Sequence, residues 1–257
     1  MASGCFGEIK SLLEQETPVV FIGTPCQVAG LLRFLKKDYA SLVTVDLICH
    51  GAPPNAYLKQ HLAELGLDAP YHKIRFRGEF DQMLTVWKEN NIVYQRDRTK
   101  DEYFIAFYEN MISYDSCFTC QYAGPKRISD ITIGDFWGLG DLQQIDPRSD
   151  RPSIILVNTE KGQAFFAKAN CNLIYEQRDV KEGIRGNGRL IQPPGKNYKA
   201  KLFRWFCGFP AAGFRKRVRI VFQISKAVDF VSRFIARLAK LKSMFLRKVT
   251  NIVRGRI

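Results

Sequence analysis

Two apolar runs near the start of the chain, each followed by a helical pattern, predict a parallel β-α-β-α unit. Residues 18–22 form a β-branched run that stops at Gly23, which is typical of a strand buried on both faces. Apolar side chains then recur at helical spacing over residues 27–35. A second buried strand is predicted over residues 42–49, and a helix from about residue 54 to residue 65, with proline in its first turn.

This unit has a geometric consequence for two cysteines. A right-handed crossover places the two strands parallel, often about 5 Å apart, with their C-terminal ends on one edge of the sheet. Cys26 follows the first predicted strand and Cys49 ends the second. We therefore expect the two sulfurs to meet at the edge where open α/β sheets bind ligands.

The middle of the chain has the alternating pattern of an antiparallel insertion. Strands are predicted over residues 73–77, 84–87 and 92–94, the last of them after a turn at residues 90–91. An amphipathic helix is predicted over residues 101–111.

Later elements complete an α/β domain that we expect to span residues 1–182. Strands are predicted over residues 130–133 and 153–158, and a helix over residues 160–169. Together the elements predict an α/β fold with a mixed sheet. Glycine and proline are frequent in residues 183–198, which are predicted to be a linker.

The remaining residues, 199–257, predict a basic helical tail. Apolar residues follow a three-then-four rhythm with Lys and Arg between them, at Val221, Ile224, Val228, Val231, Ile235, Leu238, Phe245 and Val249. The rhythm predicts one or two basic amphipathic helices. These helices would pack on the domain with a solvated basic face, or contact a membrane surface or an acidic partner through residues 214–250.

The composition excludes a disordered or membrane-spanning protein. Of the 257 residues 46% are apolar, and they include 19 Phe and 10 Tyr, which suits a packed core. No uncharged stretch approaches the roughly 20 apolar residues that a membrane-spanning helix needs. The first residues have neither the basic start nor the apolar segment of a secretory signal, so we expect a cytoplasmic protein.

The formal net charge of +14 belongs to the tail. Residues 199–257 contain 16 Lys and Arg and one acid, Asp229, whereas residues 1–198 contain 23 basic and 24 acidic residues. Because no recognised nucleic-acid motif accompanies this charge, we do not expect nucleic acid as a partner.

Seven cysteines in a chain without an export signal favour metal or redox chemistry over a disulfide framework. Cys117 and Cys120 are separated by two residues, a spacing shared by zinc sites, iron–sulfur sites and redox dithiols. If this pair folds over the edge that carries Cys26 and Cys49, four thiolates form one site. Such a site suits tetrahedral zinc or a [4Fe–4S] cluster.

Simpler roles stay open for several of these residues. Cys5, Cys171 and Cys207 are assigned to the class of cysteines that are buried and pack as small apolar side chains. The same role is open to Cys49. His50 adjoins Cys49, and because neighbours on a strand point to opposite faces, a cysteine–histidine catalytic pair is not expected.

Two loops carry further candidate groups. Residues 23–25, at the end of a buried strand, offer backbone amides of the kind that a phosphate or a flavin ring needs. Asp130 and Asp135 suit turn or capping roles. Residues 135–138 superficially resemble the magnesium-binding triplet of kinases, but the other kinase motifs are missing and this interpretation is rejected.

Five segments, taken in order, resemble one protein family. They are residues 21–30 (FIGTPCQVAG), 46–51 (DLICHG), 74–77 (IRFR), 117–120 (CFTC) and 129–138 (SDITIGDFWG). Over roughly residues 3–170 the chain resembles the C-terminal domain of the coenzyme F420 hydrogenase/dehydrogenase beta-subunit family. Members of this family are flavin and iron–sulfur proteins that pass electrons between a [4Fe–4S] cluster and FAD, in some cases onward to a deazaflavin.

The resemblance implies a role for particular residues. The implied cluster ligands are Cys26, Cys49, Cys117 and Cys120. The residues implied to lie near the flavin are Gly23, Thr24, Gln27 and His50. Arg75 or Arg77 would meet the flavin phosphates or an acidic substrate. The predicted function is therefore an iron–sulfur flavoprotein oxidoreductase or an electron-transfer subunit.

The sequence departs from the family pattern at its start. Family proteins commonly begin with a ferredoxin-like region containing Cys-x-x-Cys-x-x-Cys, which this sequence does not contain. We therefore expect a truncated reading frame or one half of a split protein, with a redox partner or ferredoxin-like chain beside it. The alternative function is a zinc-stapled, non-catalytic α/β module that docks through its basic tail. A third is a cysteine-nucleophile enzyme in which only one of the four cysteines matters for activity.

Overall fold

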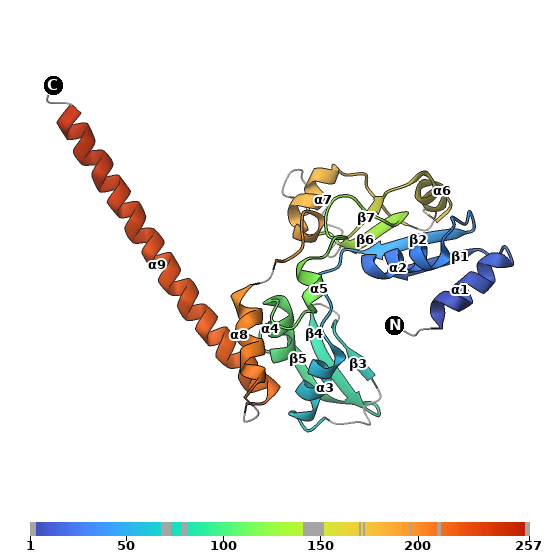
Figure 1. The fold of residues 1–257 in the computed structure, drawn as a ribbon, viewed down its shortest axis with the longest axis horizontal. Coiled ribbons are helices and arrows are strands. Elements are labelled where there is room, and N and C mark those ends of the chain that lie inside the picture. Colours follow the sequence, from blue (N-terminus) through green and yellow to red (C-terminus); the bar gives the residue numbers. More distant parts are fainter. Residues whose placement is uncertain are drawn as a thin grey trace. The chain divides into compact units, whose positions relative to one another are not determined.

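The structure is a computed structural model of the 257-residue chain (Figure 1). It describes residues 4–67, 73–78, 82–140, 152–169, 171, 173–195, 197–209 and 212–254, with side chains described as far as residue 240. The chain splits into two compact units. The cysteine unit comprises Met1–Ala52 and Tyr114–Gly195, and the tail unit comprises Pro53–Ser113 and Lys196–Ile257.

A four-stranded sheet in the order β1-β2-β6-β7 forms the centre of the cysteine unit. Its strands are β1 (Val19–Gly23), β2 (Leu42–Leu47), β6 (Ile131–Asp135) and β7 (Ser153–Val157). The first three run parallel and β7 runs antiparallel to β6, which confirms the predicted mixed sheet with a parallel start. Because Gly23 pairs with Asp46, the chain leaves β1 and β2 at the same edge of the sheet.

Two helices cover one face of this sheet over β1 and β2. They are α1 (Cys5–Glu14) and α2 (Pro25–Leu35). Ile9 of α1, Leu31 of α2 and Leu42 of β2 lie in one buried apolar cluster. The apolar spacing of the sequence predicts α2. The helix α1 is not among the predicted elements, since only two of its ten residues are buried.

The strand β1 lies at the edge of the sheet, and the prediction that it is buried on both faces is wrong. Val20 is 46% exposed and Ile22 is 60% exposed. The helices α1 and α2 contact β1 on the other face, whereas α6 (Glu160–Ala169) contacts β2 and β7. A β-branched run at the edge of a sheet therefore resembles a central strand in sequence although one of its faces stays exposed.

The segment predicted to be a linker, residues 183–198, contains regular structure in its described part. The helix α7 spans Val180–Gly186, and the 3-10 turn η2 spans Gly188–Leu190. Leu190 is fully buried in an apolar cluster with Ile154 of β7. The predicted boundaries at residues 182 and 198 stay predictions, and residues 183–195 pack within the cysteine unit.

The tail unit contains the predicted antiparallel insertion. Its sheet, in the order β3-β4-β5, consists of β3 (Lys73–Arg75), β4 (Met83–Lys88) and β5 (Asn91–Asp97). Two helices flank this sheet in the sequence, α3 (Asn55–Ala63) before it and α4 (Glu102–Tyr108) after it.

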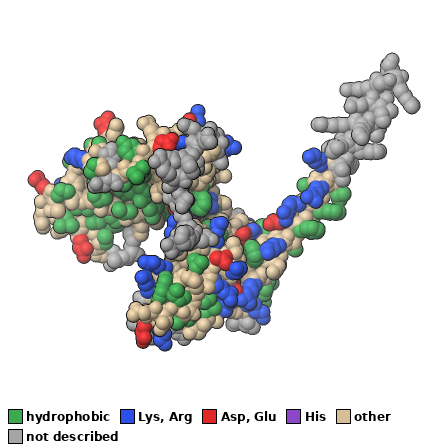
Figure 2. Space-filling view, turned by 180° about the vertical axis from the view of Figure 1, so that it is seen from behind, with side chains coloured by type: hydrophobic (Ala, Val, Ile, Leu, Met, Phe, Trp, Pro, Cys, Tyr) green, Lys and Arg blue, Asp and Glu red, His purple; other side chains and the backbone are tan. Residues whose placement is uncertain are grey.

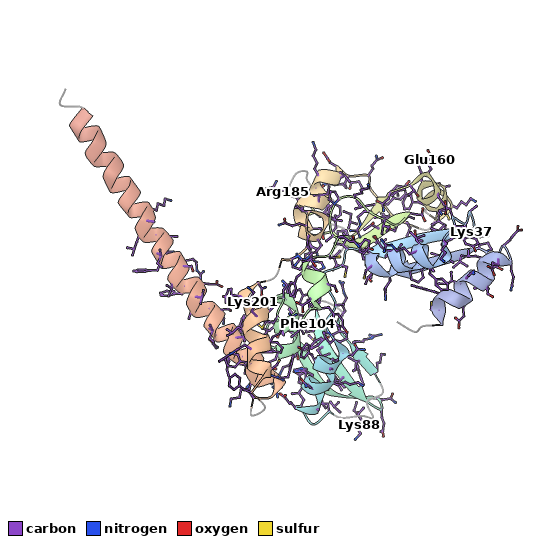
Figure 3. All side chains as sticks on the ribbon, in the orientation of Figure 1. Lys37, Lys88, Phe104, Glu160, Arg185 and Lys201 are labelled. Carbon is purple, nitrogen blue, oxygen red and sulfur yellow. The ribbon has the colours of Figure 1, made fainter. Side chains whose placement is uncertain are left out.

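Two further helices, α8 (Tyr198–Cys207) and α9 (Phe214–Arg254), confirm the predicted basic helical tail. Phe203 of α8 and Phe214 of α9 are fully buried, and they share an apolar cluster with Met111, which follows α4. Phe104 of α4 is buried as well (Figure 3). The insertion and the start of the tail therefore form a common core.

Candidate functional site

Four cysteines from three separate segments come together in the cysteine unit. Cys26 is the second residue of α2, and Cys49 lies two residues beyond the end of β2. Cys117 lies in the short helix α5 (Asp115–Phe118), and Cys120 follows this helix. The Cys49 thiol interacts electrostatically with each of the other three sulfurs. The structure therefore groups the predicted ligand set around Cys49, and all four thiols are free.

The loop after β2 determines the surroundings of Cys49. Burial raises the pKa of the Cys49 thiol. The Gly51 amide opposes this shift by donating a hydrogen bond to the Cys49 Sγ at 3.4 Å, and the charges of the neighbouring sulfurs reinforce the rise. Gly51 has a φ of 107°, which side-chain-bearing residues rarely adopt. A turn that requires glycine therefore directs this amide at the sulfur.

The strand β2 ends at Leu47, so Cys49 lies with His50 in the following loop and does not end the strand as predicted. The positive φ of Gly51 and the two prolines after residue 52 are incompatible with a longer strand. Partial desolvation lowers the pKa of His50, whose side chain is still exposed at the surface, and the positive charge of Arg189 lowers it further. Because His50 is not on a strand, the alternation of side chains along a strand does not apply to it. That alternation is therefore no argument against a catalytic pair of Cys49 and His50.

Arg127 joins the segment after Cys120 to the end of β2. Its guanidinium donates hydrogen bonds to the Tyr122 carbonyl at 3.1 Å, to Asp46 Oδ1 at 2.8 Å and to the Leu47 carbonyl at 3.2 Å. Both charged side chains of the ion pair are almost completely buried. No local sequence pattern marks Arg127, because its carboxylate partner is 81 positions away.

Arg189 is a second residue that the sequence patterns do not reveal. It lies in η2, and its carbonyl accepts a hydrogen bond from the Gly124 amide at 3.0 Å, which ties η2 to the segment that follows Cys120. Burial lowers the pKa of the Arg189 guanidinium, and negative charge at Cys49 opposes this shift. The Nε atom of Arg189 is buried without a hydrogen-bond partner among the described residues. The cysteine site therefore has a partly buried cation beside it.

The residues predicted to meet a flavin after β1 also build the start of α2. Gly23 is the last residue of β1 and is buried. The Thr24 amide donates a hydrogen bond to Gln27 Oε1 at 2.8 Å, as part of a capping box at the start of the helix. The Thr24 hydroxyl lies 3.2 Å from the Cys26 sulfur. These contacts fix the backbone that presents Cys26, and the flavin contacts of the three residues stay predictions.

A family model matches the part of the chain that carries the four cysteines. Residues 17–182, more than half of the chain, match the model for the C terminus of the beta subunit of coenzyme F420 hydrogenase/dehydrogenase. The chain belongs to this family. The match confirms the resemblance carried by the five sequence segments, and it indicates a redox role of the hydrogenase/dehydrogenase beta-subunit type. No curated protein matches the sequence.

The predicted site residues of this family member fall into both units. The four cysteines, with His50 and the capping residues of α2, lie in the cysteine unit. Arg75 and Arg77 lie in or just after β3 of the tail unit. The Arg75 guanidinium lies 6.0 Å from the centroid of the Trp87 ring. A contact of either arginine with a flavin phosphate or a substrate stays a prediction.

The other three cysteines do not have the burial that was predicted for them. Cys5, Cys171 and Cys207 are all exposed. Cys5 is the first residue of α1 and Cys207 is the last residue of α8. Helix ends are poorly covered by neighbouring elements, so a cysteine there does not pack as a core residue. These three cysteines serve as natural controls for the clustered four.

A cavity of about 350 Å³ lies in the cysteine unit beside the Cys117–Cys120 segment. Its lining consists of Ala29, Leu32 and Arg33 from α2, together with Gln121, Tyr122 and Ile128. Gln121 and Tyr122 directly follow Cys120 in the sequence. The volume is at the lower end of the roughly 300–1,000 Å³ typical of small-molecule sites. Leu32 and Ile128 give the cavity an apolar wall, and Arg33 gives it a positive charge, next to the segment of Cys120.

The spacing of the four sulfurs bears on the kind of metal they suit. Tetrahedral zinc with bonds of about 2.3 Å to sulfur requires sulfurs roughly 3.8 Å apart. Among the described residues, no three cysteine sulfurs lie within 4.8 Å of one another. The described thiols therefore do not form a closed zinc cage, and an iron–sulfur centre is the other metal group that takes four cysteine ligands.

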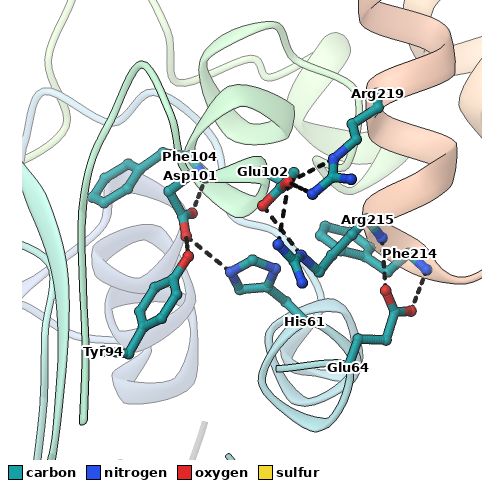
Figure 4. A network of polar contacts seen from close by, with 9 residues as sticks. All are labelled: His61, Glu64, Tyr94, Asp101, Glu102, Phe104, Phe214, Arg215 and Arg219. Carbon is teal, nitrogen blue, oxygen red and sulfur yellow. Dashed lines mark hydrogen bonds and ion pairs between the residues drawn. The ribbon is translucent and has the colours of Figure 1, made fainter. Parts of the chain in front are cut away.

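A second group of titratable side chains lies in the tail unit, where His61, Asp101 and Glu102 have ligand atoms within 4.8 Å of one another (Figure 4). His61 Nε2 lies 2.9 Å from Asp101 Oδ2, which also accepts a hydrogen bond from the Tyr94 hydroxyl at 2.8 Å. Asp101 Oδ1 accepts the Phe104 amide at 2.9 Å and so caps α4. The carboxylate of Asp101 is therefore fully engaged within the fold.

The Glu102 carboxylate of this group is neutralised by two arginines of α9. Arg215 and Arg219 both form ion pairs with it (Figure 4). A metal ion at this position would face two guanidinium charges, which disfavours a cation site. The group instead connects α3, α4 and the start of α9, and we interpret it as structural.

Proposed function

We propose that this chain is an iron–sulfur flavoprotein oxidoreductase, or an electron-transfer subunit of one, in which Cys26, Cys49, Cys117 and Cys120 hold a [4Fe–4S] cluster that exchanges electrons with FAD. The observation that carries this proposal is the grouping of four free thiols around Cys49 in a domain of the hydrogenase/dehydrogenase beta-subunit family. No three of the described sulfurs have the close mutual spacing of a zinc cage, which supports iron–sulfur ligation over the zinc-stapled alternative.

The residues around the thiols suit a negatively charged sulfur site. The Gly51 amide donates to the Cys49 sulfur, and amide hydrogen bonds to cluster sulfurs raise the reduction potential. Arg189 adds a positive charge that interacts with Cys49. Arg127 fixes the segment after Cys120 to the end of β2, so the two ligand segments keep their separation. When bound, a cluster supplies single-electron transfer and a flavin supplies hydride transfer, so the pair interconverts the two modes.

We propose that the flavin approaches the same edge of the sheet from the loops after β1 and β2. Gly23, Thr24 and Gln27 lie from the end of β1 to the first turn of α2, and His50 lies in the loop after β2. The cavity lined by Arg33 and Tyr122 provides an aromatic and cationic surface beside the cysteines. A guanidinium suits flavin phosphates, and an aromatic side chain suits the flat face of the ring. Arg75 and Arg77 are alternatives to Arg33 for binding the flavin phosphates.

The proposal includes a redox partner protein and a cytoplasmic location. The family description names a beta subunit, so a further chain of the redox complex is the natural partner, and a ferredoxin-like chain fits the proposed electron transfer. The seven free thiols suit a reducing compartment. Contact of residues 214–250 with a membrane or an acidic partner belongs to the same proposal.

Metal analysis of the anaerobically purified full chain tests the proposal. We expect about four iron and four sulfide per chain and a broad visible absorption that bleaches on reduction. Released FAD, identified by its fluorescence, tests the flavin separately. Stoichiometric zinc in a colourless protein would support the alternative module instead. A colourless protein without metal, in which one cysteine alone is alkylated and essential, would support the cysteine-nucleophile enzyme.

A further inference from the structure

The apolar side chains of the helix α9 are buried near its start and exposed farther along. Near its start, Phe214, Val218 and Val221 are fully buried in the core of the tail unit. Farther along, the apolar residues lie outside this core. The exposed apolar side chains there are 42–67% exposed, and they are Val228, Phe230, Val231, Phe234, Ile235 and Leu238. One apolar stripe therefore continues from a covered stretch of the helix into an uncovered one.

The basic side chains of α9 also differ between its start and its later part. Arg215 and Arg219 form ion pairs with Glu102 in the core of the unit. Beyond Ser225, no ion pair joins Lys226, Arg233 or Arg237 to a carboxylate among the described residues. Within the described part of the chain, Arg215 and Arg219 near the start of the helix thus pair with a carboxylate of the core, whereas Lys226, Arg233 and Arg237 do not.

Most of the later residues are sorted onto two sides of the helix. At roughly 100° per residue, five of the six exposed apolar side chains fall within about one third of the helix circumference, and Phe230 falls toward the other side. The basic residues fall on the opposite side, and they are Lys226, Arg233, Arg237 and Lys240. Apolar and basic side chains both line this part of the helix in Figure 2. This pattern is typical of helices that lie in a membrane interface.

We propose that residues 224–240 of α9 bind the surface of an anionic membrane. The apolar side, centred on Val231 and Ile235, enters the boundary between headgroups and acyl chains. The basic side, with Arg233 and Arg237, remains at the level of the anionic headgroups. This inference rests on the membrane contact named in the proposed function and specifies it, and its test does not depend on the cysteine site.

Charge favours a lipid surface over a second copy of the chain. Helices that pair through an apolar stripe use opposite charges beside it to fix the partner. Residues 199–257 contain 16 Lys and Arg and only one acid, Asp229, so two such helices side by side would repel. No helix in the described part of the chain combines the length and apolarity that crossing a bilayer requires. An anionic bilayer offers an apolar boundary for the apolar side of the helix and negative headgroups for the basic side.

Vesicle flotation with the full chain tests this inference. The probes are vesicles of phosphatidylcholine alone and vesicles with about 30% phosphatidylserine. We expect binding to the anionic vesicles that is at least tenfold stronger than to the neutral ones and that falls in about 0.5 M salt, where screening is strong. Equal binding to both kinds of vesicle, or binding to neither, would overturn the proposal.

Paired variants separate the two sides of the helix. Phe234→Ser with Ile235→Ser is expected to weaken binding at least tenfold, because two apolar side chains no longer enter the bilayer. Arg233→Gln with Arg237→Gln is expected to weaken it roughly 25-fold, about fivefold for each cation. All four positions lie outside the core, and circular dichroism verifies that the variants are folded.

The matched controls come from the sheet of the same unit. Ile92 of β5 is 54% exposed and Lys88 ends β4 (Figure 3), so Ile92→Ser and Lys88→Gln are expected to leave vesicle binding unchanged. If the controls and the α9 variants weaken binding equally, the assigned surface is wrong. If sedimentation shows a dimer that Phe234→Ser with Ile235→Ser dissociates while vesicles do not bind, the stripe belongs to a second copy and the proposal fails.

Discussion

The buried guanidinium of Arg127 donates a hydrogen bond of 2.8 Å to the carboxylate of Asp46, across 81 positions of sequence. Asp46 precedes Cys49 by three residues, and Arg127 follows Cys120 by seven. The ion pair therefore joins two of the three segments that carry the cysteines, those of Cys49 and of the Cys117–Cys120 pair. We therefore expect this ion pair to hold the segment of Cys49 and the segment of Cys120 at a fixed separation.

Removing this arginine should destabilise the fold and loosen the site. In Arg127→Ala the buried Asp46 carboxylate loses its partner, and we expect the free energy of unfolding to fall by about 3–5 kcal/mol. Urea unfolding measures this change. The exposed neighbour Lys126 gives the control, Lys126→Ala, with an expected change below about 0.5 kcal/mol. Equal stability of the two variants would show that the ion pair does not hold these segments.

The turn at Gly51 should be sensitive to any side chain. Gly51→Ala requires a strained backbone at a φ of 107°, at a cost of about 1–2 kcal/mol, and it misdirects the amide that donates to Cys49. We expect reduced iron content in the purified variant together with lower thermal stability. In the control, Gly7→Ala, a Cβ atom would meet no neighbour within 4 Å in the helix α1, so no loss of iron is expected. Full iron content in Gly51→Ala would contradict the role of this turn.

Arg189 should raise the reduction potential of the proposed cluster. Reduction adds negative charge, which a nearby cation stabilises, so Arg189→Gln is expected to lower the midpoint potential by tens of millivolts. A redox titration followed by electron paramagnetic resonance measures the shift. The exposed Arg185 of α7 (Figure 3) gives the control, Arg185→Gln, with an unchanged potential. An unchanged potential in Arg189→Gln would show that its charge does not act on the site.

The network in the tail unit predicts a pH dependence of stability. Burial raises the pKa of Asp101, but the hydrogen bonds and charge of His61, with the Phe104 amide and the Tyr94 hydroxyl, outweigh burial and hold this pKa below its usual value. Because the folded pKa is below the unfolded one, the contribution is present above about pH 4 and is lost as the pH falls through the folded value.

Asp101→Asn should therefore lower the free energy of unfolding by about 3 kcal/mol at pH 7, and the difference from wild type should shrink below about pH 4. Urea unfolding at pH 7 and pH 3 provides the comparison. Asp38, whose side chain is 90% exposed, gives Asp38→Asn as the control without such a dependence. A difference that stays constant with pH would assign the effect to packing alone.

Local patterns and the crossover rule predict much of the cysteine unit. The apolar runs locate β1 and β2, and their parallel pairing places the loops after them at one edge, as expected for Cys26 and Cys49. The spacing of Cys117 and Cys120 marks the second pair. These features depend on residues that are close in sequence or on a general rule of chain handedness.

The remaining features depend on contacts between distant residues. Neither Arg127 nor Arg189 has a neighbour in sequence that reveals its partner, because the partners lie on other elements. The exposure of Ile22 follows from the order of the strands, which an apolar run does not encode. The shared core of the insertion and the tail likewise arises from side chains such as Tyr103 and Phe214, which are far apart in sequence.

Whether four thiols hold one centre is tested by the iron content of four single variants, Cys26→Ser, Cys49→Ser, Cys117→Ser and Cys120→Ser. Each is purified without oxygen beside Cys5→Ser, which changes an exposed cysteine outside the group. Each of the four variants is expected to lose most of its iron and visible absorption, while Cys5→Ser retains both. Iron retained at the wild-type level in any two of the four variants would contradict a single centre held by these thiols.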